Sequence, residues 1–210
     1  MQWLVLGLIV FLGVHSVRIV ADDWRTQVIE RVGPLAWKAG YGLLALLGLA
    51  LVVWGYAQAR LEPAVLWSPP LAMRHAAALL TLPAFVLAVA AYVPGNALKV
   101  RLGHPLVLSV KLWATAHLLA NGNLADVLLF GGFLAWAVFN YRAARRRDAR
   151  TPGTDAADED DADDGVTEPD PRHPVSAAAT VATVVVGVAL WVVFAFWLHA
   201  VLFGVAPLGR

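Results

Sequence analysis

The chain has 210 residues, of which 60% are hydrophobic and 15% are charged, and its formal net charge is +1. This composition excludes an ordinary soluble domain, and the nearly balanced charge gives no indication of nucleic-acid binding. The absence of cysteine excludes disulfides, thiolate ligands and thiol nucleophiles.

Six long apolar stretches follow one another along the chain. Apolar runs of about 18 residues or more with few charges are typical of transmembrane helices, because the hydrocarbon core is about 30 Å thick. We therefore predict an all-α membrane bundle of six transmembrane helices. The predicted spans are Gln2–Val20, Ala36–Ala57, Leu71–Val93, Pro105–Ala120, Leu124–Tyr141 and Ala177–Ala206. Only Asn121-Gly122-Asn123 separates the fourth span from the fifth, which predicts an antiparallel helical hairpin.

Basic residues gather beside the odd-numbered loops. These residues are Arg18, Arg25, Arg31 and Lys38 at the first loop, Lys99 and Arg101 at the third, and Arg142, Arg145, Arg146, Arg147 and Arg150 at the fifth. The other side offers Arg60, Arg74 and Arg210. The positive-inside rule then predicts a multi-pass protein of the bacterial inner membrane with both termini in the periplasm.

The fifth loop, residues 148–174, interrupts an otherwise apolar chain. It contains the acidic run Asp155–Gly165, which is followed by Pro169 and Pro171, a composition that predicts disorder. A solvated linker is the favoured interpretation, and an interaction tail is the alternative. Residues 1–206 around this loop are predicted to form one membrane domain.

The fourth predicted span carries polar side chains that lipid rejects. A lysine near the middle of a span costs at least ~2.5 kcal/mol, so Lys111 should face protein, cofactor or water. His104 lies on the same helix face as Lys111, whereas His117 and Asn121 share another face at i, i+4 spacing. At a rise of ~1.5 Å per residue, His117 lies about 20 Å from His104 along the helix.

The first predicted span contains His15 and Arg18, one helical turn apart. Neutral imidazole is a common nitrogen ligand, so His15 is a candidate haem or metal ligand; the alternative is an interfacial hydrogen-bonding histidine. Arg18 either reaches lipid phosphates or joins the buried polar set. His75 and His199 either belong to an interfacial belt with the aromatic residues or join His117 around an iron or a proton path.

Several catalytic motifs are absent from the sequence. It contains no His-Glu-x-x-His, Gly-rich phosphate loop, Gly-x-Ser-x-Gly elbow or Cys-x-x-Cys-His motif. It therefore gives no support for a hydrolase, a nucleotide enzyme or a c-type cytochrome.

A set of short motifs resembles the NnrU family over most of the chain. They are His15-Ser16-x-Arg18, Gly40-Tyr41, Gly103-His104-Pro105, the stretch from Trp113 through Ala116-His117 to Asn121-Gly122-Asn123, and Arg142-x-x-Arg145-Arg146. Proteins of this family are inner-membrane proteins associated with denitrification. The resemblance implies an accessory role in nitrogen-oxide metabolism, with haem or a respiratory nitrogen-oxide reductase as a partner.

The same family includes the zeta-carotene isomerase, which uses histidine-ligated haem b. By this resemblance His15, His104 and His117 match the isomerase histidines, which implies haem b as the cofactor and His15 with His104 as inner-leaflet iron ligands. A pair of histidines on the fifth isomerase helix is replaced here by Trp136-Ala137. This departure counts against isomerase activity.

Three functions are therefore carried forward, each with the lipid bilayer as partner. The first is an accessory membrane protein of nitrogen-oxide metabolism that binds haem. The alternative is a haem-dependent isomerase of a lipid-soluble polyene such as a carotenoid. The second alternative is a small-molecule or anion transporter with Lys111 as counter-ion, which the absence of internal repeats disfavours.

Overall fold

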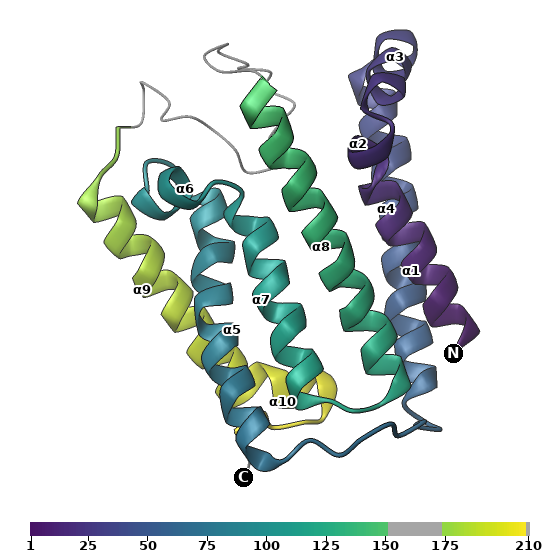
Figure 1. Ribbon diagram of the computed structural model, residues 1–210, viewed down its shortest axis with the longest axis vertical. Coiled ribbons are helices and arrows are strands. Elements are labelled where there is room, and N and C mark those ends of the chain that lie inside the picture. The colour runs from purple at the N-terminus through teal and green to yellow at the C-terminus, as the bar shows by residue number, and fades with distance from the viewer. Residues whose placement is uncertain (151–173, 209–210) are drawn as a thin grey trace. The chain divides into compact units, whose positions relative to one another are not determined.

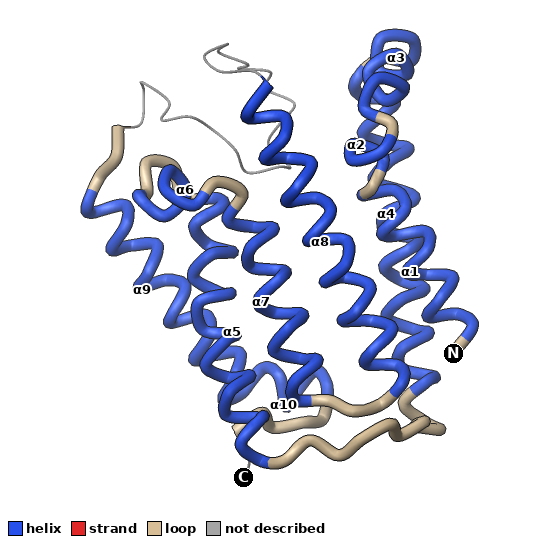
Figure 2. Tube along the Cα trace, in the orientation of Figure 1, coloured by secondary structure: helices blue, strands red, loops and turns tan. Residues whose placement is uncertain are grey.

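The computed structural model describes residues 1–150 and 174–208, and its regular secondary structure is helical (Figures 1 and 2). In chain order the elements are α1 (Gln2–His15), α2 (Val17–Val20), α3 (Asp22–Val32), α4 (Pro34–Ala59), α5 (Leu71–Tyr92), α6 (Ala97–Leu102), α7 (Pro105–Ala120), α8 (Leu124–Arg150), α9 (Ala177–Val193), the π-helical η2 (Phe194–Leu198) and α10 (His199–Phe203). The predicted all-α class is confirmed.

Four predicted spans coincide with helices that are long and apolar enough to cross a membrane. These helices are α4, α5, α8 and the continuous stretch Ala177–Phe203 formed by α9, η2 and α10. The two other predicted spans correspond to α1 and α7, apolar helices of 14 and 16 residues. At 1.5 Å per residue they extend roughly 21 and 24 Å, less than the hydrocarbon core of about 30 Å. Within the described residues, length and composition thus establish four candidate spans.

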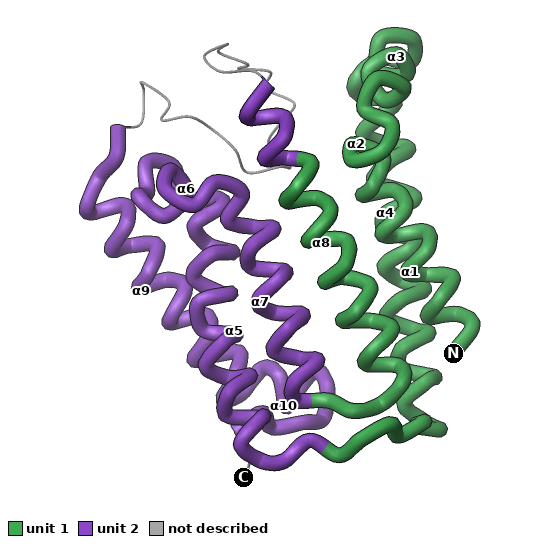
Figure 3. The backbone as a smooth tube through the Cα atoms, in the orientation of Figure 1, with its two compact units in different colours: residues 1–68, 121–143 green, residues 69–120, 144–210 purple. Residues whose placement is uncertain are grey.

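The chain divides into two compact units, coloured separately in Figure 3. Unit 1 comprises residues 1–68 and 121–143, and unit 2 comprises residues 69–120 and 144–210. One boundary falls before the Asn121-Gly122-Asn123 turn and another within α8, so each unit is described by itself. The single domain over residues 1–206 and the pairing of α7 with α8 stay predictions.

The predicted acidic loop is described only at its two ends. Its first residues, Asp148 to Arg150, belong to α8, which continues beyond the predicted end at Tyr141. The acidic run Asp155–Gly165 lies outside the described residues.

Unit 1 is built on a close approach of α1 to α4. A Cβ atom at Gly48 would lie 2.7 Å from the backbone nitrogen of Phe11, and one at Gly55 would overlap the backbone of Leu4. Small residues let two backbones come together, which is how helices associate in a membrane where apolar side chains gain little from leaving lipid. The two glycines therefore set the spacing of this helix pair.

The turn before α8 is held by the segment that follows α4. The backbone N–H groups of Leu66 and Trp67 donate to the Gly122 carbonyl at 2.8 and 3.1 Å, and the Leu124 N–H donates to the Ala64 carbonyl at 2.9 Å. A side chain at Gly122 would overlap the Trp67 carbonyl. These bonds place the start of α8 beside the end of α4 in unit 1.

In unit 2, α5 packs against both α7 and α9. A Cβ atom at Gly187 would lie 2.6 Å from the Val86 Cα, so α9 approaches α5 as closely as α1 approaches α4. The indole N–H of Trp191 donates to the Thr81 hydroxyl oxygen at 3.0 Å. Small residues and a side-chain hydrogen bond thus fix this pair of helices.

Candidate functional site

His15 lies half-buried at the end of α1, among aromatic rings from three helices of unit 1. Its ring centroid is 4.2 Å from that of Phe11 on α1, 5.5 Å from Tyr41 on α4 and 6.1 Å from Trp136 on α8. These four residues form what we call the aromatic cluster. The site is thus assembled by helices that are distant in sequence.

The protonation of the His15 ring follows from its hydrogen bond. Its Nδ1 lies 2.7 Å from the carbonyl oxygen of Phe11. A carbonyl oxygen only accepts, so Nδ1 carries the proton and the lone pair of the neutral ring is on Nε2. A backbone carbonyl commonly fixes the tautomer of a metal-ligating histidine in this way. His15 therefore presents Nε2 as a nitrogen donor.

Trp136 stands at the fifth-helix position where the isomerase resemblance implies a histidine. Its ring is nearly perpendicular to that of His15, at 88°, and the centroid separation of 6.1 Å corresponds to direct ring contact. Two rings in direct contact leave no room for a porphyrin between them. His15 is also the only histidine in residues 1–68 and 121–143. Unit 1 therefore offers one imidazole as a possible haem ligand and not a pair of histidines.

The Trp136 side chain has a second distinctive property. Its indole Nε1 is buried and has no hydrogen-bond partner within the described part of the chain. An unsatisfied buried donor costs about 1–3 kcal/mol, so its presence in the aromatic cluster needs a reason. An acceptor atom bound near Trp136 would satisfy this N–H.

His104 occupies a different environment at the start of unit 2's α7. It is only 2% exposed, and its Nε2 lies 3.2 Å from Oδ2 of Asp148, which the Arg145 guanidinium also approaches at 3.4 Å. Its backbone φ is 42°, in the left-handed region that few residues other than glycine adopt, directly after Gly103 at 57°. The strained backbone aims the ring at a carboxylate, so Nε2 is already engaged.

The remaining predicted site residues, Lys111, His117, Arg18 and Asn121, are half-buried. In unit 2, His117 Nδ1 donates to the Trp113 carbonyl at 2.8 Å, and the Lys111 carbonyl accepts from the Thr115 hydroxyl at 2.8 Å. Among the described residues, no three His, Asp or Glu side chains come together as a metal site.

Two predicted site residues, Arg18 and Asn121, belong to unit 1, and the predicted pair of iron ligands would join the two units. Arg18 lies on α2, and Asn121 opens the turn before α8. His15 belongs to unit 1 and His104 to unit 2, so their pairing as iron ligands stays a prediction.

The segment between α5 and α7 contains a buried residue that caps the N-terminus of α6 and a partly buried lysine. The fully buried Asn96 accepts from the Lys99 backbone N–H at 2.8 Å and so begins α6. The Lys99 ammonium donates to the Ala91 carbonyl at 3.0 Å, and burial lowers the pKa of this lysine. The positive charge predicted for this loop is therefore partly enclosed by protein.

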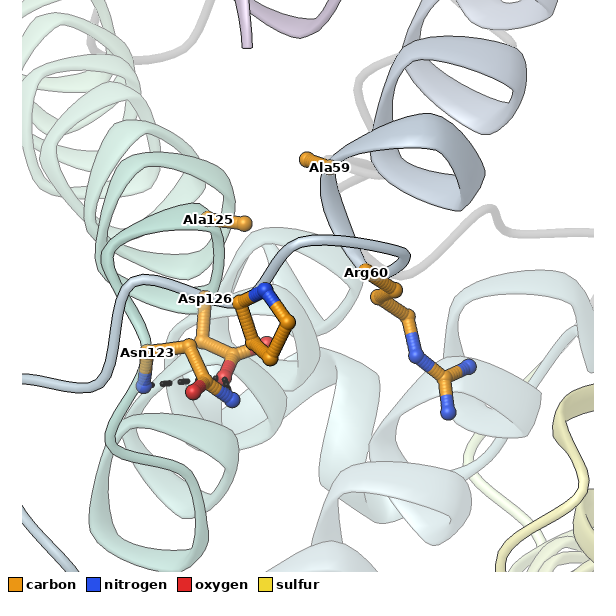
Figure 4. A pocket seen from close by; sticks show the side chains of 6 residues that line it. Ala59, Arg60, Asn123, Ala125 and Asp126 are labelled. Atoms are coloured by element: carbon orange, nitrogen blue, oxygen red, sulfur yellow. Dashed lines mark hydrogen bonds between the residues drawn. The ribbon is translucent and has the colours of Figure 1, made fainter.

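A second polar cluster joins the end of α4 to the start of α8 in unit 1 (Figure 4). Asp126 is only 3% exposed. Its carboxylate accepts from the Tyr56 hydroxyl at 2.5 Å, and from the backbone nitrogen and side-chain Nδ2 of Asn123 at 3.2 and 2.9 Å. The spacing Asn123-x-x-Asp126 is that of a capping box, in which the third residue of a helix bonds back to its N-cap.

A pocket of about 240 Å³ opens beside this cluster. The residues that line it are Ala59, Arg60, Pro63, Asn123, Ala125 and Asp126, five of which Figure 4 labels. The Arg60 guanidinium carbon lies 6.0 Å from the centroid of the Tyr56 ring. The pocket thus combines one buried carboxylate with one guanidinium.

The sequence-based prediction missed Asp126 and Tyr56. Two signals were available for Asp126, because it is an ionisable residue inside a predicted span and it stands at capping-box spacing from Asn123. No local signal pairs Tyr56 with it, since 70 positions separate the two residues.

The fold and these sites define an all-helical protein with helices of membrane-spanning length and a histidine held in an aromatic cluster. The chain matches the family described as NnrU protein over residues 3–207. It therefore belongs to the NnrU family, and the resemblance inferred from its motifs is confirmed. No match was found among the curated proteins or the solved structures.

Proposed function

We propose that this NnrU protein is a multi-pass protein of the bacterial inner membrane that supports nitrogen-oxide metabolism as an accessory, and that the imidazole of His15 would hold a haem b. The observation that carries the proposal is the geometry of His15. Its Nδ1–H is bound to a backbone carbonyl, its Nε2 lone pair is available for coordination, and aromatic rings surround it.

The ligation by one imidazole connects this site to nitrogen oxides. A haem held there by one imidazole would supply an iron that can bind a diatomic molecule such as nitric oxide. Trp136 supports this arrangement because it stands on the fifth predicted span where the isomerase has a histidine, and its ring contacts His15 directly. Binding or sensing of nitric oxide beside a respiratory reductase is the accessory role that this chemistry serves.

The proposal includes six membrane crossings with both termini in the periplasm. α1 is followed after Ser16 by α2, which carries the first apolar stretch on to Val20. The basic residues Lys99 and Arg101 precede α7, and a basic cluster ends α8, as expected for cytoplasmic loops. Tilt or local thinning of the bilayer accommodates helices as short as α1 and α7 at modest cost.

The haem proposal is tested by titrating detergent-purified full-length protein with haemin. We expect saturation near one equivalent with a Soret band, loss of that band in His15→Ala, and a further spectral shift when nitric oxide is added to the reduced protein. His117→Ala is the matched control, because His117 makes the same bond to a carbonyl four residues earlier. A wild type without a Soret band, or an unchanged His15→Ala titration, would overturn the ligand assignment.

The accessory role is tested separately in cells. Deletion of the gene from a denitrifying host should slow nitrite or nitric oxide consumption, and His15→Ala should restore less activity than wild type. Unchanged consumption of nitrite and nitric oxide in the deletion strain would contradict the nitrogen-oxide role, whatever the haem titration gives.

A further inference from the structure

The pocket beside Asp126 lies where a helix of spanning length ends and another begins. α4 ends at Ala59 and α8 begins at Leu124, and both helices have the length and hydropathy of membrane spans. The ends of such helices lie at the boundary between hydrocarbon and water, where lipid headgroups are found. The pocket therefore opens at headgroup depth.

The buried carboxylate of Asp126 can accept one more hydrogen bond. Its two oxygens offer about four acceptor sites, and Tyr56 and Asn123 fill three of them. A ligand that donates N–H to Asp126 would complete its coordination.

Arg60 supplies the opposite charge to the same pocket. Its guanidinium has five N–H donors in a planar fork that suits phosphate and carboxylate groups. Arg60 is exposed, and Figure 4 shows its side chain extending from the end of α4, whereas Asp126 and Asn123 come from the start of α8. The residues that line the pocket thus carry one negative and one positive side chain.

We propose that this pocket binds a zwitterion with a primary ammonium and a nearby anionic group, as in the phosphoethanolamine headgroup. The ammonium donates to Asp126, and the phosphate accepts from Arg60. The volume of about 240 Å³ is well above the roughly 10–15 Å³ that a single water molecule needs, which leaves room for a small headgroup. The shared chemistry allows two sources, a phosphatidylethanolamine lipid or a free small zwitterion, and the site is independent of His15.

The lipid arm compares phosphatidylethanolamine with phosphatidylcholine. Both lipids carry a phosphate, but the choline nitrogen has no N–H to donate to Asp126. Native mass spectrometry of the full-length protein should show preferential retention of the ethanolamine lipid. Arg60→Gln and Asp126→Asn should each reduce the preference about tenfold, because each removes a charge-assisted contact. Arg74→Gln is the matched control, since Arg74 is an exposed arginine on α5 and should leave the preference unchanged.

The free-ligand arm measures binding of phosphoethanolamine and phosphocholine to the detergent-purified protein by calorimetry. Binding of free phosphoethanolamine that Arg60→Gln weakens supports the site with a soluble source, and retention of the lipid alone supports it with a membrane source. Equal retention of both lipids with no binding of free phosphoethanolamine overturns the proposal. So does an ethanolamine preference that survives Arg60→Gln, a surface change that leaves the capping box of Asp126 intact.

Discussion

Two half-buried histidines, His15 and His117, share the same local bond and differ in their neighbours. In each, Nδ1–H donates to the carbonyl four residues earlier, at 2.7 and 2.8 Å. Beside His15 lies Trp136 with an unsatisfied buried N–H, whereas Trp191 in unit 2 donates its N–H to Thr81. Local sequence sets the histidine bond, and rings from α4 and α8 surround His15.

The two tryptophans give a matched stability test in ligand-free protein. Trp191→Phe removes a hydrogen bond that contributes about 1 kcal/mol, whereas Trp136→Phe removes a donor that bonds to nothing in the described residues. We expect Trp136→Phe to unfold about 2–4 °C above Trp191→Phe in thermal scans of detergent-purified protein. Equal or reversed unfolding temperatures would mean that the Trp136 N–H is satisfied in solution.

Tyr56 and Asp126 form the second residue pair whose energy can be measured. Their hydrogen bond of 2.5 Å joins α4 to α8 across 70 positions of sequence. A double-mutant cycle of Tyr56→Phe and Asp126→Asn should give a coupling energy of about 1–3 kcal/mol, because the bond is charge-assisted and the carboxylate is buried. Additive effects in denaturant unfolding would show that the two side chains contribute independently.

At the scale of elements, the helices are joined through glycines whose missing side chains make room for backbone. Gly48 and Gly55 on α4 face α1, and Gly187 on α9 faces α5. On the same α4, Gly40 and Gly42 have nothing within 4 Å of a built Cβ atom. Composition alone therefore does not separate the structural glycines from the others.

This difference gives a prediction within a single helix. Gly55→Ala should destabilise unit 1, because its new methyl group would overlap the Leu4 backbone. Gly42→Ala should leave stability unchanged or raise it by up to about 1 kcal/mol, since alanine has the higher helix propensity. Thermal unfolding of the two variants checks the ordering, and a more stable Gly55→Ala protein would contradict the packing of α1 on α4.

At the scale of the whole molecule, the number of membrane crossings decides on which side each loop lies. Four helices have spanning length, and the proposed topology requires α1 and α7 to cross as well. The two arrangements differ in the side of the membrane on which each loop lies.

Single cysteines can settle the topology, because the natural chain has none. With six crossings, an impermeant thiol reagent should label Gln2→Cys and Asn121→Cys in intact spheroplasts. It should label Thr26→Cys and Arg101→Cys only after permeabilisation. Equal labelling of Gln2→Cys and Thr26→Cys would show that α1 does not cross the membrane. Equal labelling of Arg101→Cys and Asn121→Cys would show the same for α7.

Much of the helical framework was predictable because a long apolar run is a local property. Helices in lipid satisfy their own backbone hydrogen bonds, so hydropathy indicates where they occur. The predicted Pro105–Ala120 span agrees with α7 at both ends. The short helices α3 and α6 were not predicted, since neither has a long apolar run and Asn96 caps α6 from a loop.

By itself the sequence determined the helical class, the apolar segments of spanning length, the NnrU motifs and the candidate histidines, all of which depend on composition or short spacing. Only the tertiary structure decided that Trp136 contacts His15, that Asp148 engages His104, and that Asp126 joins Tyr56 beside a pocket. These contacts join residues between 44 and 121 positions apart. The energy of such a contact arises only when helix packing brings the two side chains together, so no local pattern records it.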